Sequence, residues 1–220
     1  NMNHSIMVFN HKDLVKQNEL IAESTKIISK SNIPLAKAHK SYIRVFKSFI
    51  GGLEHIVLQI GNPNKKKAIN LRIQSACLTG EVFHSMKCDC NEQLHQSIDY
   101  ISKNGGGYII HLEQEGRGIG LANKIKAYDM QYKGMDTYDA DVMMGFTGEE
   151  RDFKVAEKIL KFLKIKNVNL ITNNQLKVNT LKKYGIKINK RIPTNPSINK
   201  FNYKYLSSRI RKTKYKIILK

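Results

Sequence analysis

The 220-residue sequence contains no tryptophan, three cysteines, only 18 acidic residues and no long apolar run. A transmembrane helix needs about 18 or more consecutive apolar residues, so none is expected. No short basic stretch followed by an apolar block stands near the N-terminus, so we expect no signal peptide and a cytoplasmic location. Hydrophobic residues make up 41% of the chain, which excludes a disordered protein and suits one folded domain.

The scarcity of acidic residues leaves a formal net charge of +20. Such a charge favours a polyanionic partner: nucleic acid, an anionic membrane or a phosphorylated substrate. However, 31 of the 38 basic residues are lysines, and Asn and Ile are abundant with them, as in proteins from AT-rich genomes. We therefore attribute most of the excess to compositional background and give the seven arginines more weight. Because aromatic residues are only 8% and no stacking motif lies among the basic ones, nucleic acid is the less favoured partner.

The three cysteines, Cys77, Cys88 and Cys90, fall within the 14-residue stretch CLTGEVFHSMKCDC. Cys88 and Cys90 are too close for an ordinary disulfide, so the cluster favours a metal. Three thiolates without a fourth cysteine are typical of a catalytic zinc site, which leaves one position for water. The alternatives are a structural zinc whose fourth ligand is a histidine (His84, His95 or His111) and three ordinary buried thiols.

Hydrophobic periodicity predicts a mixed α/β (α+β) fold in which a strand-rich first part is followed by alternating helices and strands. Strands are expected over residues 41–50, 55–60, 68–75, 108–112, 168–172 and 186–192. Helices are expected over residues 11–30, 91–103, 121–132, 151–165 and 175–184, with Asn91 capping the second of them. Gly51–Gly52 and the Lys65–Lys67 region are expected turns, and a basic tail follows Thr194-Asn195-Pro196.

A glycine-containing loop, QEGRGIG at residues 114–120, lies between a predicted strand and a predicted helix. Its glycines let backbone N–H groups approach an anion, and Arg117 could add a charge-assisted bond to phosphate. The same spacing also suits a tight structural turn, and it is not a Walker sequence. Arg151 could clamp phosphate or form a surface pair with Glu149, and Thr172 and Lys177 follow a strand, where α/β folds place ligands.

Five segments in one order, CLTGEVFHSMKCDC, QEGRGIGLANKIKAYDMQ, DTYDAD, GFTGEERDF and LITNNQLK, resemble the GTP cyclohydrolase II family. The resemblance covers about residues 31–206 and implies a single compact catalytic domain with a mixed sheet and flanking helices. Residues 1–30 would then be an extension, expected to be helical, and residues 207–220 a basic tail. The family uses zinc and magnesium to hydrolyse GTP to formate, pyrophosphate and a diaminopyrimidinone ribosyl phosphate, the first step of riboflavin biosynthesis, typically as homodimers.

The resemblance also implies roles for individual residues. It makes Cys77, Cys88 and Cys90 the zinc ligands, with the ion activating the water that attacks the ring carbon lost as formate. Tyr128 would assist proton transfer, Arg151 matches a residue proposed as nucleophile toward the α-phosphorus, and Glu149 matches a proton acceptor. Since a guanidinium stays protonated, charge stabilisation is the better reading of Arg151. The implied substrate-binding positions are Arg72, Gln74, Ser75, Ala76, Gln93, Glu115, Gly116, Arg117, Thr137, Thr172 and Lys177.

Several positions depart from the family pattern. Gln74 and Ala76 replace the histidine and glutamate that usually precede the first cysteine, and Glu113 stands where a basic residue is common. Glu149 replaces a usual Asp, and Gln175 a usual Pro. A diverged homologue with an altered nucleotide substrate or product is therefore an alternative. A zinc-stabilised, basic nucleic-acid-binding protein is the alternative from another class.

Overall fold

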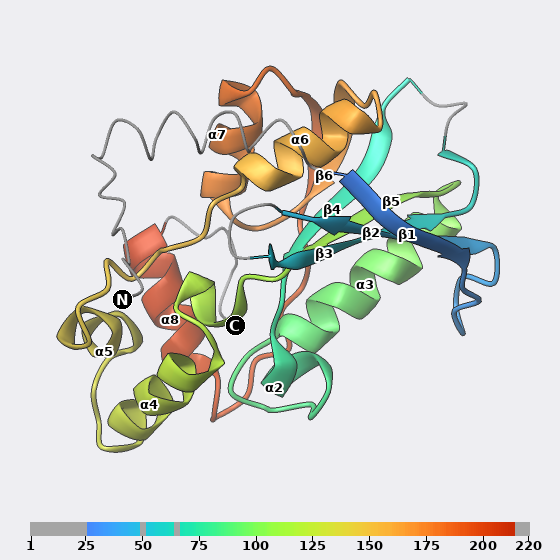
Figure 1. Ribbon diagram of the computed structural model, residues 1–220. Helices are drawn as coiled ribbons and strands as arrows, with labels where there is room; N and C mark the ends of the chain where they lie inside the picture. Colours follow the sequence, from blue (N-terminus) through green and yellow to red (C-terminus); the bar gives the residue numbers. More distant parts are fainter. Residues whose placement is uncertain (1–25, 49–51, 64–66, 214–220) are drawn as a thin grey trace, which may run out of the picture.

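A seven-stranded mixed sheet forms the centre of the computed structural model, which describes residues 26–48, 52–63 and 67–213 (Figure 1). The strand order is β1-β2-β3-β5-β4-β6-β7. The strands are β1 (Lys26–Asn32), β2 (Ser41–Lys47), β3 (Glu54–Ile60), β4 (Ile69–Ser75), β5 (Gly107–Leu112), β6 (Asn167–Ile171) and β7 (Lys187–Ile192). The helices are α2 (Leu78–Glu81), α3 (Cys90–Lys103), η3 (Glu115–Gly118), α4 (Leu121–Tyr132), α5 (Thr137–Met143), α6 (Lys154–Phe162), α7 (Gln175–Lys183) and α8 (Tyr203–Thr213).

The sheet has an antiparallel half and a parallel half. β1, β2, β3 and β5 pair antiparallel, whereas β5, β4, β6 and β7 run parallel. The β4 strand lies between β5 and β6, so the carboxyl ends of these three strands meet at one edge. In open α/β sheets this edge is where ligands bind.

Helices cover both faces of the sheet. α6 and α7 lie on one face, where Ile159, Leu160 and Leu181 pack in a core with the strands, and α3 lies on the other (Figure 1). Ile101 of α3 packs there in a second core with Ile109 of β5. Because side chains alternate along a strand, the apolar residues of β4 enter the first core and Asn70, Arg72 and Gln74 point toward α3. This alternation places two polar side chains near the edge where the strands end.

Three helices, α4, α5 and α8, gather at that end of the sheet (Figure 1). α5 begins after Asp136, whose side chain accepts a hydrogen bond from Tyr138 N. Ser208 of α8 donates to the same carboxylate at 3.1 Å, and Leu206 and Ser208 are fully buried. α8 is therefore a packed part of the domain. No helix among the described residues has the length and apolarity to cross a membrane.

The mixed α/β fold is confirmed, with every strand expected from residue 41 onward present to within a few residues. Some details were wrong. Lys26–Lys30, expected to be helical, belong to the edge strand β1, and residues 11–25 lie outside the described residues. The cap of α3 is Asp89 rather than Asn91, and α6 spans only Lys154–Phe162. Residues 207–213, expected in a tail, belong to α8, while residues 214–220, the predicted turn at Gly51, and Lys65 and Lys66 lie outside the described part.

Candidate active site

A pocket opens at the carboxyl ends of the parallel strands and gathers most of the residues singled out in the sequence. Of those seventeen residues, fifteen line it: Arg72, Gln74, Ser75, Ala76, Cys77, Cys88, Cys90, Gln93, Glu115, Gly116, Arg117, Tyr128, Thr137, Arg151 and Lys177. Glu149 and Thr172 do not line it. Segments far apart in the sequence therefore meet at the edge that the strand order creates.

The three cysteines come together at one side of this pocket. Cys77 follows β4, Cys88 precedes α3 and Cys90 begins it, and their sulfurs all lie within 4.8 Å of one another. Cys77 Sγ and Cys88 Sγ are 3.7 Å apart. Gly80 makes this approach feasible, because a Cβ there would lie 2.8 Å from Cys88 Sγ and 3.1 Å from Cys77 Sγ.

The three thiols oppose one another's ionisation. Hydrogen bonds from Cys88 and Cys90, together with Lys124, lower the pKa of Cys77 far below its usual value. The same contact with Cys77 raises the pKa of Cys88 to about 12, and both neighbours raise that of Cys90. The close sulfurs thus oppose one another's ionisation. A soft divalent ion would allow all three to become thiolates, so this donor set fits zinc.

No fourth protein ligand joins the sulfurs among the residues described. His84 and His95 are exposed, and His111 Nε2 pairs instead with Glu81 Oε2 at 2.8 Å. Lys124 Nζ also lies beside the sulfurs, 3.2 Å from Cys77 Sγ and 2.8 Å from Glu115 Oε1. Within this part of the chain, the alternative of a structural site closed by one of these histidines therefore finds no support.

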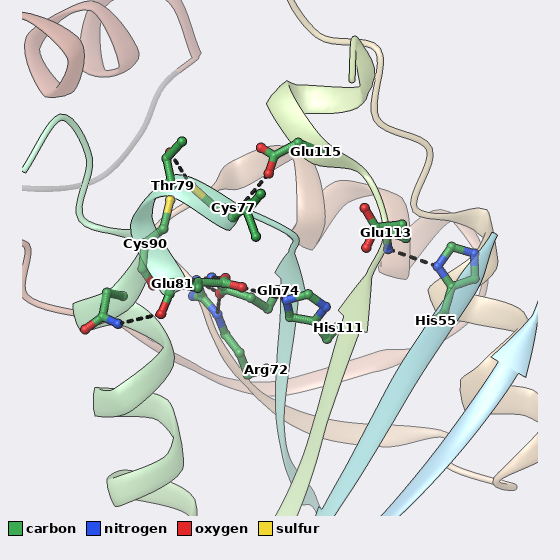
Figure 2. Close-up of polar contacts among 12 residues, drawn as sticks. His55, Arg72, Gln74, Cys77, Thr79, Glu81, Cys90, His111, Glu113 and Glu115 are labelled. Atoms are coloured by element: carbon green, nitrogen blue, oxygen red, sulfur yellow. Dashed lines mark hydrogen bonds and ion pairs between the residues drawn. The ribbon is translucent and has the colours of Figure 1, made fainter. Parts of the chain in front are cut away.

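A hydrogen-bonded chain behind the cysteines fixes Arg72. Its Nε and Nη2 donate to Gln74 Oε1 at 2.8 and 2.6 Å, and Nη2 also donates to Gln93 Oε1 at 2.6 Å. Gln74 Nε2 in turn donates to Glu81 Oε1 at 2.7 Å, and Glu81 reaches His111 (Figure 2). The guanidinium is buried, so these acceptors set its orientation.

The glycine loop bends sharply at the pocket rim. Gly116 and Arg117 both have positive φ, at 61° and 63°, and α4 starts after Gly120. Arg117 pairs with Asp141 and lies over the Tyr138 ring, 4.3 Å from its centroid. Glu115 turns inward, where it accepts from Lys124 Nζ and from Leu78 N at 2.6 Å. This carboxylate ties the loop to the cysteine segment.

Arg151 and Glu149 form a bidentate ion pair. The pair is not a surface one, because the Arg151 side chain is 9% exposed and lines the pocket. Burial by itself would raise the pKa of Glu149, but the bonds from Arg151 outweigh burial and hold it below its usual value. Glu149 is therefore an anion held by a cation, which makes it a weak proton acceptor.

Lys177 and Tyr128 are both buried and both have shifted pKa values. Burial lowers the pKa of Lys177 well below its usual value, and the nearby Arg72, Arg151 and Arg209 lower it further. Its Nζ donates to Ile73 O at 2.7 Å. Burial raises the pKa of Tyr128 to about 12, against the opposing effect of Lys124, so the phenol keeps its proton at neutral pH.

Thr172 lies behind the pocket and supports the loop that follows β6. Its hydroxyl accepts from Asn174 N at 3.0 Å, and its carbonyl accepts from Arg191 Nε at 3.0 Å. The threonine is 1% exposed. Its contacts in the structure are those of a residue that shapes the turn before α7.

The sequence of this chain is similar to those of known proteins. The family model for GTP cyclohydrolase II matches residues 25–193, most of the chain. The chain belongs to the GTP cyclohydrolase II family. It is 44% identical over 165 residues to GTP cyclohydrolase-2 of Histophilus somni (strain 2336), covering 75% of this chain and 76% of that one. It is 44% identical over 166 residues to GTP cyclohydrolase-2 of Haemophilus influenzae (strain PittEE), covering 75% and 77%.

A longer relative is the riboflavin biosynthesis protein RibBA of Endomicrobium trichonymphae. This chain is 42% identical to it over 165 residues, which are 75% of this chain and 41% of that protein. The GTP cyclohydrolase II match thus corresponds to one part of that larger protein. The match of the family model also begins at residue 25, slightly before the 31 expected from the motifs.

Of the five departures from the GTP cyclohydrolase II pattern, Gln74 and Ala76 line the pocket and Glu113, Glu149 and Gln175 do not. Gln74 is the acceptor for Arg72. The Glu113 side chain is exposed and does not line the pocket, while its backbone N donates to His55 Nδ1 at 3.1 Å (Figure 2). Gln175 starts α7 and accepts from Arg191 Nη1 at 2.8 Å, which ties α7 to β7.

Some pocket residues of this GTP cyclohydrolase II homologue were missed in the sequence. Lys124, Asp141, Tyr205 and Arg209 all line the pocket. Lys124 is one of 31 lysines, so its residue type did not mark it as a site residue. Arg209 is one of only seven arginines, and this scarcity was the signal that could have identified it.

Proposed function

We propose that this protein hydrolyses GTP to 2,5-diamino-6-ribosylamino-pyrimidinone 5'-phosphate, formate and pyrophosphate, the first step of riboflavin biosynthesis. The observation that carries the proposal is the joining of a three-cysteine cluster and the basic side chains Arg72, Arg151 and Lys177 in one pocket of a GTP cyclohydrolase II chain. The cysteine cluster suits a metal that activates water, and the basic side chains suit a triphosphate. The relatives named GTP cyclohydrolase-2 support the same activity.

Zinc would be held by Cys77, Cys88 and Cys90, and when bound it supplies a Lewis acid that makes water acidic near neutral pH. The residues of the chain then bind and orient the nucleotide. Arg117 and Arg151 would face the phosphates, where a guanidinium can form two parallel bonds. Mg²⁺ would enter with the triphosphate.

Proton transfer and charge stabilisation are assigned to two pocket residues. Tyr128 stays protonated at neutral pH, since burial raises its pKa to about 12, and it would assist proton transfer as the ring opens. Arg151 would stabilise charge at the α-phosphate as a cation rather than attack it. Glu149 would hold Arg151 in place, because its pKa is kept low by that same arginine.

The test measures formate and pyrophosphate separately after zinc-loaded protein is incubated with GTP and Mg²⁺. Both products in equal amounts are expected. If neither formate nor pyrophosphate formed, the assignment to GTP would be refuted. Pyrophosphate without formate would favour the second candidate, a homologue with an altered product, which the Gln74 contact with Arg72 motivates.

Zinc itself is tested with Cys88→Ser. This variant is expected to lose stoichiometric zinc and formate release while keeping its fold, because a hydroxyl is a poor zinc ligand compared with a thiolate. Met86→Ala, at a 54% exposed neighbouring position, is the matched control and should keep both. Wild-type formate release by the Ser variant would exclude the ion from the reaction.

The proposal extends to assembly and location. A homodimer is supported by exposed apolar side chains beside the site, including Val82 at 59% and Phe83 at 72% exposure. Light scattering of purified protein would give its mass. A cytoplasmic location fits three free thiols at a site that works only when they are reduced.

A further inference from the structure

The C-terminal helix α8 forms one wall of the nucleotide pocket. Tyr205 and Arg209 line the pocket together with Arg72, Arg151 and Lys177. Both side chains come from a segment beyond residue 193, where the match to the family model ends. The pocket is therefore completed by residues outside the matched region.

α8 is anchored firmly enough to hold a side chain in place. Asn202, just before it, is fully buried, and its Nδ2 donates to Ser197 O at 2.7 Å. Ser208 Oγ donates to Asp136, the residue that caps α5, and α5 begins with the pocket residue Thr137. The helix α8 therefore contacts the start of α5 beside the pocket.

Arg209 is a largely buried side chain that faces Asp89 and Tyr205 at the pocket. Its side chain is 11% exposed, and its Nη1 lies 3.9 Å from Asp89 Oδ1, a long ion pair. The same nitrogen donates to Tyr205 Oη at 3.2 Å. The other oxygen of Asp89 already accepts from Gln93 Nε2 at 2.6 Å. Asp89 is thus shared between Gln93 and Arg209.

The positive charges at this corner influence one another. Arg209, Arg72 and Arg151 each help to lower the pKa of Lys177, and among the acidic groups Glu149 opposes them. Four basic side chains, from β4, from the segment before α6, from α7 and from α8, therefore gather in the pocket. Such an arrangement is costly in the free protein and becomes favourable when a polyanion binds.

We propose that Arg209 binds the phosphate chain of the nucleotide, so that the C-terminal helix completes the substrate pocket. This inference rests on the proposed function, because it adds a substrate-binding residue to the same site. The fork of N–H groups of an arginine suits phosphate oxygens, and Tyr205 would hold the guanidinium in orientation.

The experiment compares two probes by calorimetry on the zinc-loaded protein with Mg²⁺: the α,β-methylene analogue of GTP, and guanosine, which lacks phosphates. Arg209→Gln should weaken binding of the analogue about 10- to 100-fold, the value of a charge-assisted bond, and leave guanosine binding within about twofold. Arg209→Lys, which keeps the charge but loses the fork, should weaken the analogue by about 3- to 10-fold.

Lys204→Gln is the matched control, since it removes one positive charge from an exposed position on the same helix. It should leave the binding of both probes unchanged. Unchanged affinity of Arg209→Gln for the analogue, or an equal loss for both probes, would overturn the inference while wild-type binding still supported the proposed function. Failure of the wild-type protein to bind the analogue would instead overturn the proposed function. Thermal melts establish that each variant is folded, and Arg209→Lys provides the measurement if Arg209→Gln is not.

Discussion

Lys124 Nζ lies 3.2 Å from Cys77 Sγ and 2.8 Å from Glu115 Oε1, so one buried ammonium joins the cysteine cluster to the glycine loop. Burial alone would lower the pKa of Lys124, but Tyr128, Cys77 and Glu115 raise it overall. The lysine therefore stays charged. Its neighbours come from three separate segments, and their spacing depends on it.

Removal of this ammonium should destabilise the fold. Lys124→Met leaves the Glu115 carboxylate buried without its cation, which costs about 3 kcal/mol of unfolding free energy. The double variant Lys124→Met/Glu115→Gln should recover at least about 1 kcal/mol of that loss. Denaturant unfolding of the wild-type protein, the single variants Lys124→Met and Glu115→Gln, and the double variant gives the double-mutant cycle. Lys133→Met, which breaks an exposed pair with Asp129 at the end of the same helix, should change stability by less than about 0.5 kcal/mol. Additive effects of the two site variants would contradict the coupling.

Gly80 should be required for metal affinity. Gly80→Ala adds a Cβ that would lie 2.8 Å from Cys88 Sγ, so the sulfurs must spread apart. We expect zinc affinity to fall by at least about tenfold, as measured by competition with a chelator. Leu78→Ala, on the same short helix with a 39% exposed side chain, is the control. Equal affinity of Gly80→Ala and the wild-type protein would show that the cluster tolerates the methyl group.

Gln74 should control how well Arg72 meets the substrate. Gln74→Ala removes the acceptor for two of its N–H groups while Gln93 Oε1 and Ile171 O still accept from the guanidinium, so its direction becomes less strictly fixed. We expect KM for GTP to rise about tenfold, with kcat changed less than about threefold. Gln59→Ala, which removes the acceptor for Arg44 outside the pocket, is the control and should leave KM unchanged. A lower KM in Gln74→Ala would mean that Gln74 competes with the nucleotide for Arg72.

His55 should make stability fall in mild acid. Burial, assisted by His111, lowers its pKa from 6.5 to about 4, so the folded protein holds it neutral while the unfolded chain protonates. Between these values the unfolded state binds more protons, and stability is lost as pH falls from about 6.5 to about 4, by at most about 3 kcal/mol. His55→Asn, whose Oδ1 can still accept from Glu113 N, should flatten this part of the profile. His39→Gln, at an exposed position, should not. Denaturant unfolding at several pH values measures both.

The class of fold and the candidate metal ligands could be predicted from the amino-acid pattern alone. Period-two and helical patterns are local properties, so the strands from residue 41 onward and the helices α3, α4, α6 and α7 could be located from them, whereas α2, α5 and α8 were missed. The cysteines stood out because three soft ligands within 14 residues are rare in a reduced protein. The glycine loop and Arg151 could be singled out in the same way, by residue type and spacing.

Which side chains face one another could be seen only in the folded chain. Whether Arg72 meets Gln93, or Lys124 meets Cys77, depends on strand order and helix placement, which arise from packing over the whole chain. Lys26–Lys30 become a strand because β2 offers them a partner, a choice that local propensity does not contain. The helix α8 was not predicted, and its last residues were assigned to a basic tail. A helix with few apolar residues is stabilised mainly by its tertiary contacts, here with α5 and the pocket.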